Sequence, residues 1–115
     1  MDMSKNKIDL MTLDGQKIYG PKGIGALYRR RGVPLGPIVR GGKQEHGLRA
    51  GTEAVPLIVG LGEAVRIAAA ERSTAAERVS KLRDSFLGEL LREVPGAELN
   101  GDPHERLPNN VNISI

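Results

Sequence analysis

The chain contains no cysteine, and this absence excludes several kinds of site at once. Without a thiol there is no disulfide, no thiolate metal site and no cysteine nucleophile within these residues. Only two histidines occur, His46 and His104, and they lie far apart in the sequence. A zinc site is therefore not expected, and we assign no metal ligands.

Long apolar runs and aromatic residues are also scarce. No apolar run approaches the roughly 20 residues of a membrane span, and the opening MDMSKNKIDL lacks the apolar stretch of a signal peptide. These features predict a cytoplasmic protein. Aromatic residues make up only 3% of the chain, so a core must be built from Leu, Ile, Val and Ala. The net charge of +3 permits an anionic ligand but does not by itself indicate nucleic acid.

What is present is typical of an α/β domain or of a piece of one. IDLMTL (residues 8–13) and GIGALYRR (residues 23–30) have the composition of strands, and their short connection predicts antiparallel neighbours. GPIVRGG (residues 36–42) predicts a third extended segment. VNISI alternates apolar and polar residues, which predicts a half-buried strand at residues 111–115. Strands at both ends, with open edges, suggest a chain cut at each end.

Two helical segments are predicted between these strands, with a junction near Ala70. The first has Thr52 as its N-cap and Pro56 in its first turn. The second ends before Pro95-Gly96. The residues expected to form the apolar stripe of the first segment are Val55, Ile58, Val59, Gly62, Val65 and Ala69.

The stretch LDGQKIYGPKGIGALY (residues 13–28) places two lysines among four glycines. It is not a P-loop, because neither lysine is followed by Ser or Thr. One interpretation is a tight hairpin with two solvated lysines. The other is a seat for a phosphate-bearing aldehyde cofactor, in which glycines let the backbone approach the phosphate, Lys17 bonds the aldehyde and Lys22 adds positive charge.

Several blocks in order favour the second interpretation. GQKIYGPKGIGALYRRR, GGKQEHGLRAGTEAVPLIVGLGEA, LNGD and PNNVNISI together resemble the cysteine desulfurases, class V of the fold-type I pyridoxal phosphate enzymes. The resemblance covers residues 9–115. It implies an α/β fragment of that fold. Residues 1–69 would be the end of the large cofactor-binding domain, and residues 70–115 the start of the small α+β domain.

The resemblance also implies a chemistry. Lys17 would be the Schiff-base lysine of pyridoxal 5'-phosphate, and Thr52 would reach the phosphate of the cofactor bound mainly to the partner subunit of a homodimer. The substrate would be L-cysteine, which yields L-alanine and an enzyme persulfide. A sulfur-acceptor protein could then serve iron–sulfur clusters or tRNA thiolation. The persulfide cysteine would lie outside these residues.

The chain departs from the family where the phosphate is held. The family's Ser-x-His-Lys is replaced by Asp14-Gly15-Gln16-Lys17. Gln16 can still donate a hydrogen bond through its amide. Asp14 either caps a backbone turn or weakens cofactor binding by repelling the phosphate. Arg40 and Lys43 keep the following glycine-rich segment cationic.

Other functions stay open on the sequence alone. The chain could belong to a related class V enzyme, such as an aminotransferase or selenocysteine lyase, or to a non-catalytic scaffold that has lost the cofactor. Glu45 and His46 could form an acid–base pair, or they could lie in an exposed loop or at a subunit contact. Residues 29–31, three consecutive arginines, could bind nucleic acid or simply end a strand in solvent. His104, among turn residues, is expected to be solvated.

We predict that the 115-residue chain alone does not turn over L-cysteine, because it contains no cysteine to accept the sulfur. The measurement is an assay of sulfide and alanine after incubation with pyridoxal phosphate and L-cysteine. Sustained release of both products would refute the prediction.

Overall fold

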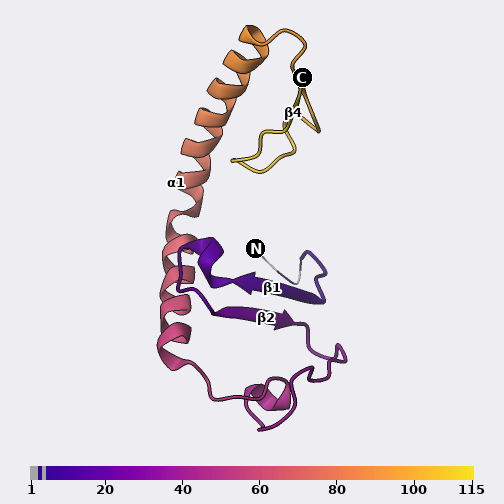
Figure 1. Ribbon diagram of the computed structural model, residues 1–115, viewed down its shortest axis with the longest axis vertical. Coiled ribbons are helices and arrows are strands. Elements are labelled where there is room, and N and C mark those ends of the chain that lie inside the picture. Colours follow the sequence, from indigo (N-terminus) through magenta and orange to yellow (C-terminus); the bar gives the residue numbers. More distant parts are fainter. Residues whose placement is uncertain (1–2, 4) are drawn as a thin grey trace. The chain divides into compact units, whose positions relative to one another are not determined.

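The structure is a computed structural model that describes residue 3 and residues 5–115. It divides into two compact units, one up to Ala68 and one from Ala69 onward. In chain order the elements are β1 (Leu10–Asp14), the 3-10 helix η1 (Gly15–Ile18), β2 (Gly25–Arg29), the 3-10 helix η2 (Glu45–Gly47), α1 (Val55–Glu93), β3 (Glu98–Leu99) and β4 (Ile113–Ser114) (Figure 1).

The first unit is built on an antiparallel hairpin of β1 and β2, which confirms the predicted pairing. The register runs from Leu10 opposite Arg29 to Asp14 opposite Gly25. Gly25 cannot be replaced without a shift, because a Cβ there would lie 2.6 Å from the Leu13 carbonyl oxygen. Glycine is therefore required at the end of the hairpin that adjoins the glycine-rich connection.

The connection in residues 15–24 folds back on itself by backbone hydrogen bonds. The Gly15 N–H donates to the Ile24 carbonyl at 2.9 Å, and the Gly20 N–H donates to the Gly15 carbonyl at 2.9 Å. Tyr19 ends η1 in the left-handed conformation, with φ 61°. The connection is thus an ordered turn.

The first half of α1 packs on this connection, and the packing corrects the predicted stripe. The buried apolar side chains in the described part of the chain are Leu61 and Ala64. Val55 and Val59 of the predicted stripe are 60% and 67% exposed. This half of the helix is apolar around most of its circumference, so periodicity did not determine which side faces the connection.

The start of α1 also differs from the prediction. The helix begins at Val55, and the Ile58 N–H donates to the Ala54 carbonyl at 3.0 Å, so Ala54 occupies the N-cap position. Thr52 is exposed in the preceding loop and does not cap the helix. Pro56 does lie in the first turn, where a missing N–H costs no hydrogen bond.

The two helical segments predicted on either side of Ala70 form one helix, because α1 continues without a break to Glu93. Residues 63–87 contain neither glycine nor proline and are rich in good helix formers. Lys81 and Glu77 form an ion pair of 2.7 Å one turn apart. The predicted stop is confirmed, since Pro95 follows the helix and Gly96 has φ 83°.

The strands outside the hairpin are shorter than predicted. Residues 36–42 form no strand, and they include Pro37 and three glycines, which do not favour a sheet. At the carboxyl end, β4 pairs antiparallel with β3, which places Leu99 opposite Ile113. The predicted strand at residues 111–115 is thus reduced to two residues.

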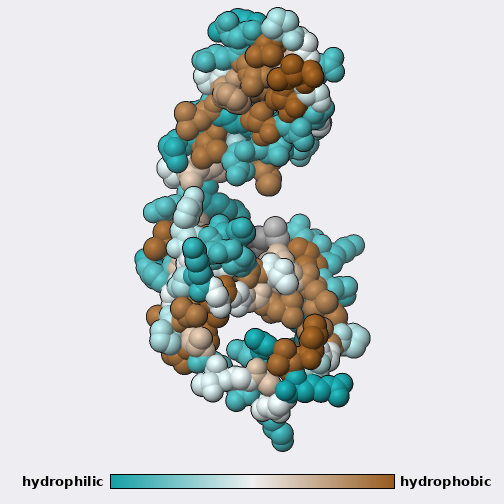
Figure 2. Space-filling view, viewed as in Figure 1, coloured by the Kyte–Doolittle hydropathy of each residue, from teal (hydrophilic) through white to brown (hydrophobic). Residues whose placement is uncertain are grey.

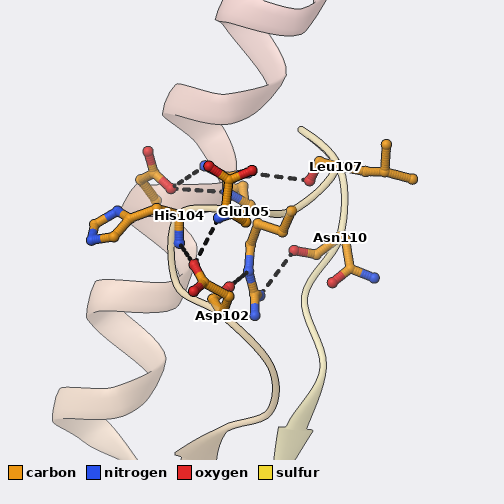
Figure 3. Close-up of polar contacts among 8 residues, drawn as sticks. Asp102, His104, Glu105, Leu107 and Asn110 are labelled. Carbon is orange, nitrogen blue, oxygen red and sulfur yellow. Dashed lines mark hydrogen bonds and ion pairs between the residues drawn. The ribbon is translucent and has the colours of Figure 1, made fainter. Parts of the chain in front are cut away.

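The loop between β3 and β4 in the second unit is held by arginine–carbonyl contacts. The Arg106 guanidinium donates to the carbonyls of Asn100 at 2.7 Å, Asp102 at 2.8 Å and Asn110 at 3.3 Å. Arg83 of α1 donates to the Leu107 carbonyl at 3.2 Å. Figure 3 shows the side chains and carbonyls of this network around Asp102 and Asn110.

Asp102 closes the start of the same loop. Its Oδ1 accepts the N–H groups of Glu105 and His104, each at 2.7 Å (Figure 3). These hydrogen bonds, the one from Glu105 first, stabilise the carboxylate and lower the pKa of Asp102 below its usual value. Asp102 therefore acts as an Asx-type cap, while its neighbour His104 remains exposed, as expected.

Much apolar surface is left uncovered in both units. Figure 2 shows hydrophobic residues at the surface of each. Tyr19 and Ile38 in the first unit are almost completely exposed, and so is Ile115 in the second. Apolar exposure on this scale is typical of surfaces that contact other protein.

We predict that Arg106→Met destabilises the second unit by about 2 kcal/mol, because three carbonyls lose a charged donor. Arg78→Met is the matched control, since Arg78 is exposed on α1 and makes no hydrogen bond or ion pair among the described residues. The measurement is the free energy of unfolding in urea. Equal values for the two variants would contradict the prediction.

Candidate functional site

Lys17 is the third residue of η1, and its side chain is exposed. Its amine makes no hydrogen bond or ion pair within the part of the chain that the structure describes. An amine without a protein partner can bond a ligand without first breaking a contact. Lys17 therefore has the accessibility that a covalent anchor needs.

Asp14 caps the turn that carries Lys17. Its Oδ1 accepts the backbone N–H of Gln16 at 3.1 Å, and its Oδ2 accepts the Gln16 side-chain amide at 3.3 Å. Of the two alternatives for Asp14, the cap is confirmed. Both carboxylate oxygens are engaged by N–H donors, and the Gln16 amide is engaged with them.

An open hollow of about 340 Å³ lies beside the turn. Its lining residues are Leu13, Asp14, Gln16, Gly23, Ile24 and Gly25. The two glycines bring backbone to the surface of the hollow without side chains. Asp14 and Gln16 are thus brought together at its edge, and Lys17 follows Gln16 in the chain without lining the hollow itself.

Thr52 is not joined to this group. Among the described residues, no hydrogen bond or ion pair connects Thr52 to Asp14, Gln16 or Lys17. The resemblance implies that Thr52 serves the partner subunit's cofactor, and that role stays a prediction. Thr52 is an exposed residue.

The loop before Thr52 has an unusual backbone. Glu45 and His46 both have positive φ, 48° and 58°, and Gly47 follows with φ 77°. Positive φ is costly for residues with a side chain. Both side chains are exposed, and they share no hydrogen bond or ion pair in the described chain. The structure thus agrees with an exposed loop rather than with an acid–base pair.

Gln44 is a residue that the sequence analysis missed. Its side-chain oxygen accepts the Gly51 N–H at 3.2 Å and closes the loop that precedes Thr52. The available signal was the pair of glycines that follows it, Gly47 and Gly51. Glycines indicate a turn, and the backbone N–H groups of a turn need hydrogen-bond acceptors. Gln44 therefore helps to hold the segment that leads to Thr52.

Two of the three consecutive arginines at residues 29–31 have partners nearby in the chain. Arg30 pairs with Asp9, and Arg29 donates to the Val33 carbonyl at 3.5 Å, which fits a solvated strand end. Within the described residues, no group of three or more acidic or histidine side chains could hold a metal ion. No helix in that part of the chain is long and apolar enough to span a membrane.

The chain belongs to the aminotransferase class-V family, whose sequence model matches residues 1–115. Among curated relatives, the cysteine desulfurase of Trichormus azollae is 50% identical over 115 residues, which is 100% of this chain and 29% of the relative. Cysteine desulfurase IscS 1 of Archaeoglobus fulgidus is 49% identical over 113 residues, 98% of this chain and 29% of the relative. A solved structure of a NifS-like protein matches with a TM-score of 0.88 and 39% identity, over 99% of this chain and 31% of that chain.

These comparisons confirm the resemblance to cysteine desulfurases and the predicted fold class, an α/β part of the fold-type I architecture. The chain spans about 29% of the length of the first two relatives. The division into large-domain and small-domain segments stays a prediction. So do the roles of Lys17, Gln16, Asp14 and Thr52.

We predict that Asp14→Ala destabilises the first unit by about 1 kcal/mol, because the turn loses its cap. Asp14→Ser is the matched control, since a hydroxyl can also accept the Gln16 N–H, and it should lose only a few tenths of that amount. Urea unfolding of both variants measures the difference. The capping role is wrong if serine costs as much as alanine.

Proposed function

We propose that this chain carries the cofactor-anchoring segment of a pyridoxal phosphate-dependent cysteine desulfurase that works as a cytoplasmic homodimer. The observation that carries the proposal is the unpaired amine of Lys17, presented by a turn whose carboxylate, Asp14, is already engaged. The curated relatives named cysteine desulfurase support it across the whole of this chain.

The residues around the turn fit a phosphate-bearing aldehyde. Lys17 would hold it covalently, and the backbone at Gly23 and Gly25 would leave room for it beside the hollow. Lys22, exposed and without a partner among the described residues, adds positive charge. The Asp14 carboxylate would repel the phosphate, but the two N–H groups of Gln16 that it accepts would offset part of this repulsion. Pyridoxal phosphate, when bound, supplies an electron sink for a carbanion on the substrate carbon.

Lys17 would have a second task in the reaction of L-cysteine. When its Nζ is not bonded to the cofactor, it can carry a proton to or from the substrate carbon, as a positioned general acid–base. The sulfur must pass to a cysteine, and this chain has none. We therefore assign sulfur acceptance to residues outside this segment, before transfer to an acceptor protein, and L-alanine is the other product.

The loop before α1 would serve the second subunit. Thr52 is an exposed residue whose hydroxyl would donate to a phosphate held mainly by the partner. Arg40 and Lys43 are exposed and have no ion-pair partner among the described residues, so they would add positive charge there. The apolar surface left open in both units would be covered by the rest of the enzyme and by the partner subunit.

The test uses Lys17→Ala and, as matched control, Lys22→Ala in the polypeptide that carries this chain. We expect Lys17→Ala to lose the absorbance of lysine-bound cofactor and its fixation by borohydride, and to lower L-cysteine turnover at least about a hundredfold. Lys22→Ala should keep the fixed cofactor. Fixation that persists in Lys17→Ala, or that is absent from the unaltered protein, overturns the proposal.

A further inference from the structure

We propose that Gly60 of α1 is a positioning residue, which sets the place of the turn that presents Lys17. The proposal rests on the proposed function for the chemistry of Lys17. Its structural basis is a contact at backbone distance between α1 and the glycine-rich connection. That contact lies entirely within the first unit.

The contact leaves no room for a side chain at residue 60. A Cβ there would lie 2.5 Å from Cγ and 3.1 Å from Cδ of Pro21. The proline ring is rigid and fixes its own φ, so it cannot rotate aside as a flexible side chain would. Any substituent at residue 60 must push either the helix or the Pro21 segment outward.

The next turn of the helix repeats the close approach. A Cβ at Gly20 would lie 3.1 Å from the Ala64 Cβ and 2.9 Å from the Gly15 carbonyl oxygen. Ala64 itself is 8% exposed. Gly20 and Pro21 therefore lie against two successive turns of α1. Figure 1 shows η1 and the following connection beside this half of the helix.

The displacement would reach Lys17 through the backbone. The Gly20 N–H is bonded to the Gly15 carbonyl, and the Gly15 N–H is bonded to the Ile24 carbonyl, so the turn is held between the helix and the hairpin. Gly15 is buried. The Lys17 side chain has no partner of its own among the described residues. The position of its amine therefore depends on the backbone of this turn, from which the side chain starts.

Gly62, two residues further along α1, provides the matched control. A Cβ at Gly62 meets nothing within 4 Å. Both glycines lie in the same helix, where glycine is less favourable than alanine by about 1 kcal/mol. Gly60→Ala and Gly62→Ala therefore gain the same helical propensity and differ in the contact with Pro21.

The test compares these two variants in the polypeptide that carries this chain. Without cofactor, we expect the Gly15 and Gly20 amides to exchange hydrogen at least about tenfold faster in Gly60→Ala and at the unaltered rate in Gly62→Ala. With pyridoxal phosphate and L-cysteine, a misplaced amine should lower kcat about tenfold or more with little change in KM. It should also slow the fixation of the cofactor by borohydride.

A second variant keeps the proposal testable if Gly60→Ala folds poorly. Gly60→Ala combined with Pro21→Ala removes the ring that the new methyl group meets, and we expect it to recover both slow exchange and fixation. Equal behaviour of Gly60→Ala and Gly62→Ala, or no recovery in the double variant, overturns the positioning role. If the unaltered protein fixes no cofactor, the proposed function fails, while hydrogen exchange still decides whether Gly60 positions the turn.

Discussion

The close approach of α1 to the glycine-rich connection is the constraint on which the first unit depends. Ala64, one of the two buried apolar side chains of the described chain, lies at this contact. Glycines at residues 20 and 60 allow it, and a Cβ at either would meet atoms at 3.1 Å or less. Because glycine weakens a helix and adds entropy to the unfolded chain, such positions are costly unless the contact offsets the loss. The helix is therefore fitted closely to the connection at Gly20 and Pro21.

A second constraint is electrostatic. Asp14 stabilises the turn by capping it, but the same carboxylate lines the hollow, where its charge would repel an anionic ligand. The cap limits this conflict, because two N–H groups of Gln16 already compensate the carboxylate. A serine would cap with no charge at all. The local stability of this turn and its affinity for an anion thus depend on the same side chain in opposite ways.

The sequence predicted those parts of the fold that local rules determine. The hairpin follows from two apolar segments around a glycine-rich link, and the end of α1 follows from Pro95-Gly96. The buried side of α1 did not follow, because apolar residues surround its first half and the close contact with Pro21 selects Gly60. Thr52 resembled an N-cap by type, yet the helix begins after Ala54. At the site, the cap by Asp14 was foreseen as one of two alternatives, whereas the hydrogen bond of Gln44 was not.

The connection between the two strands is longer and more ordered than a hairpin needs. Two antiparallel strands can be joined by a turn of two residues. Here the chain between Asp14 and Gly25 forms a capped 3-10 turn instead, with Tyr19 in the left-handed conformation. A left-handed conformation is unfavourable for a side chain as large as tyrosine, and here that side chain is also fully exposed. Neither feature improves the hairpin. Both follow from a backbone path that folds residues 15–24 into a hydrogen-bonded turn beside the helix, and this turn fixes the backbone of Lys17.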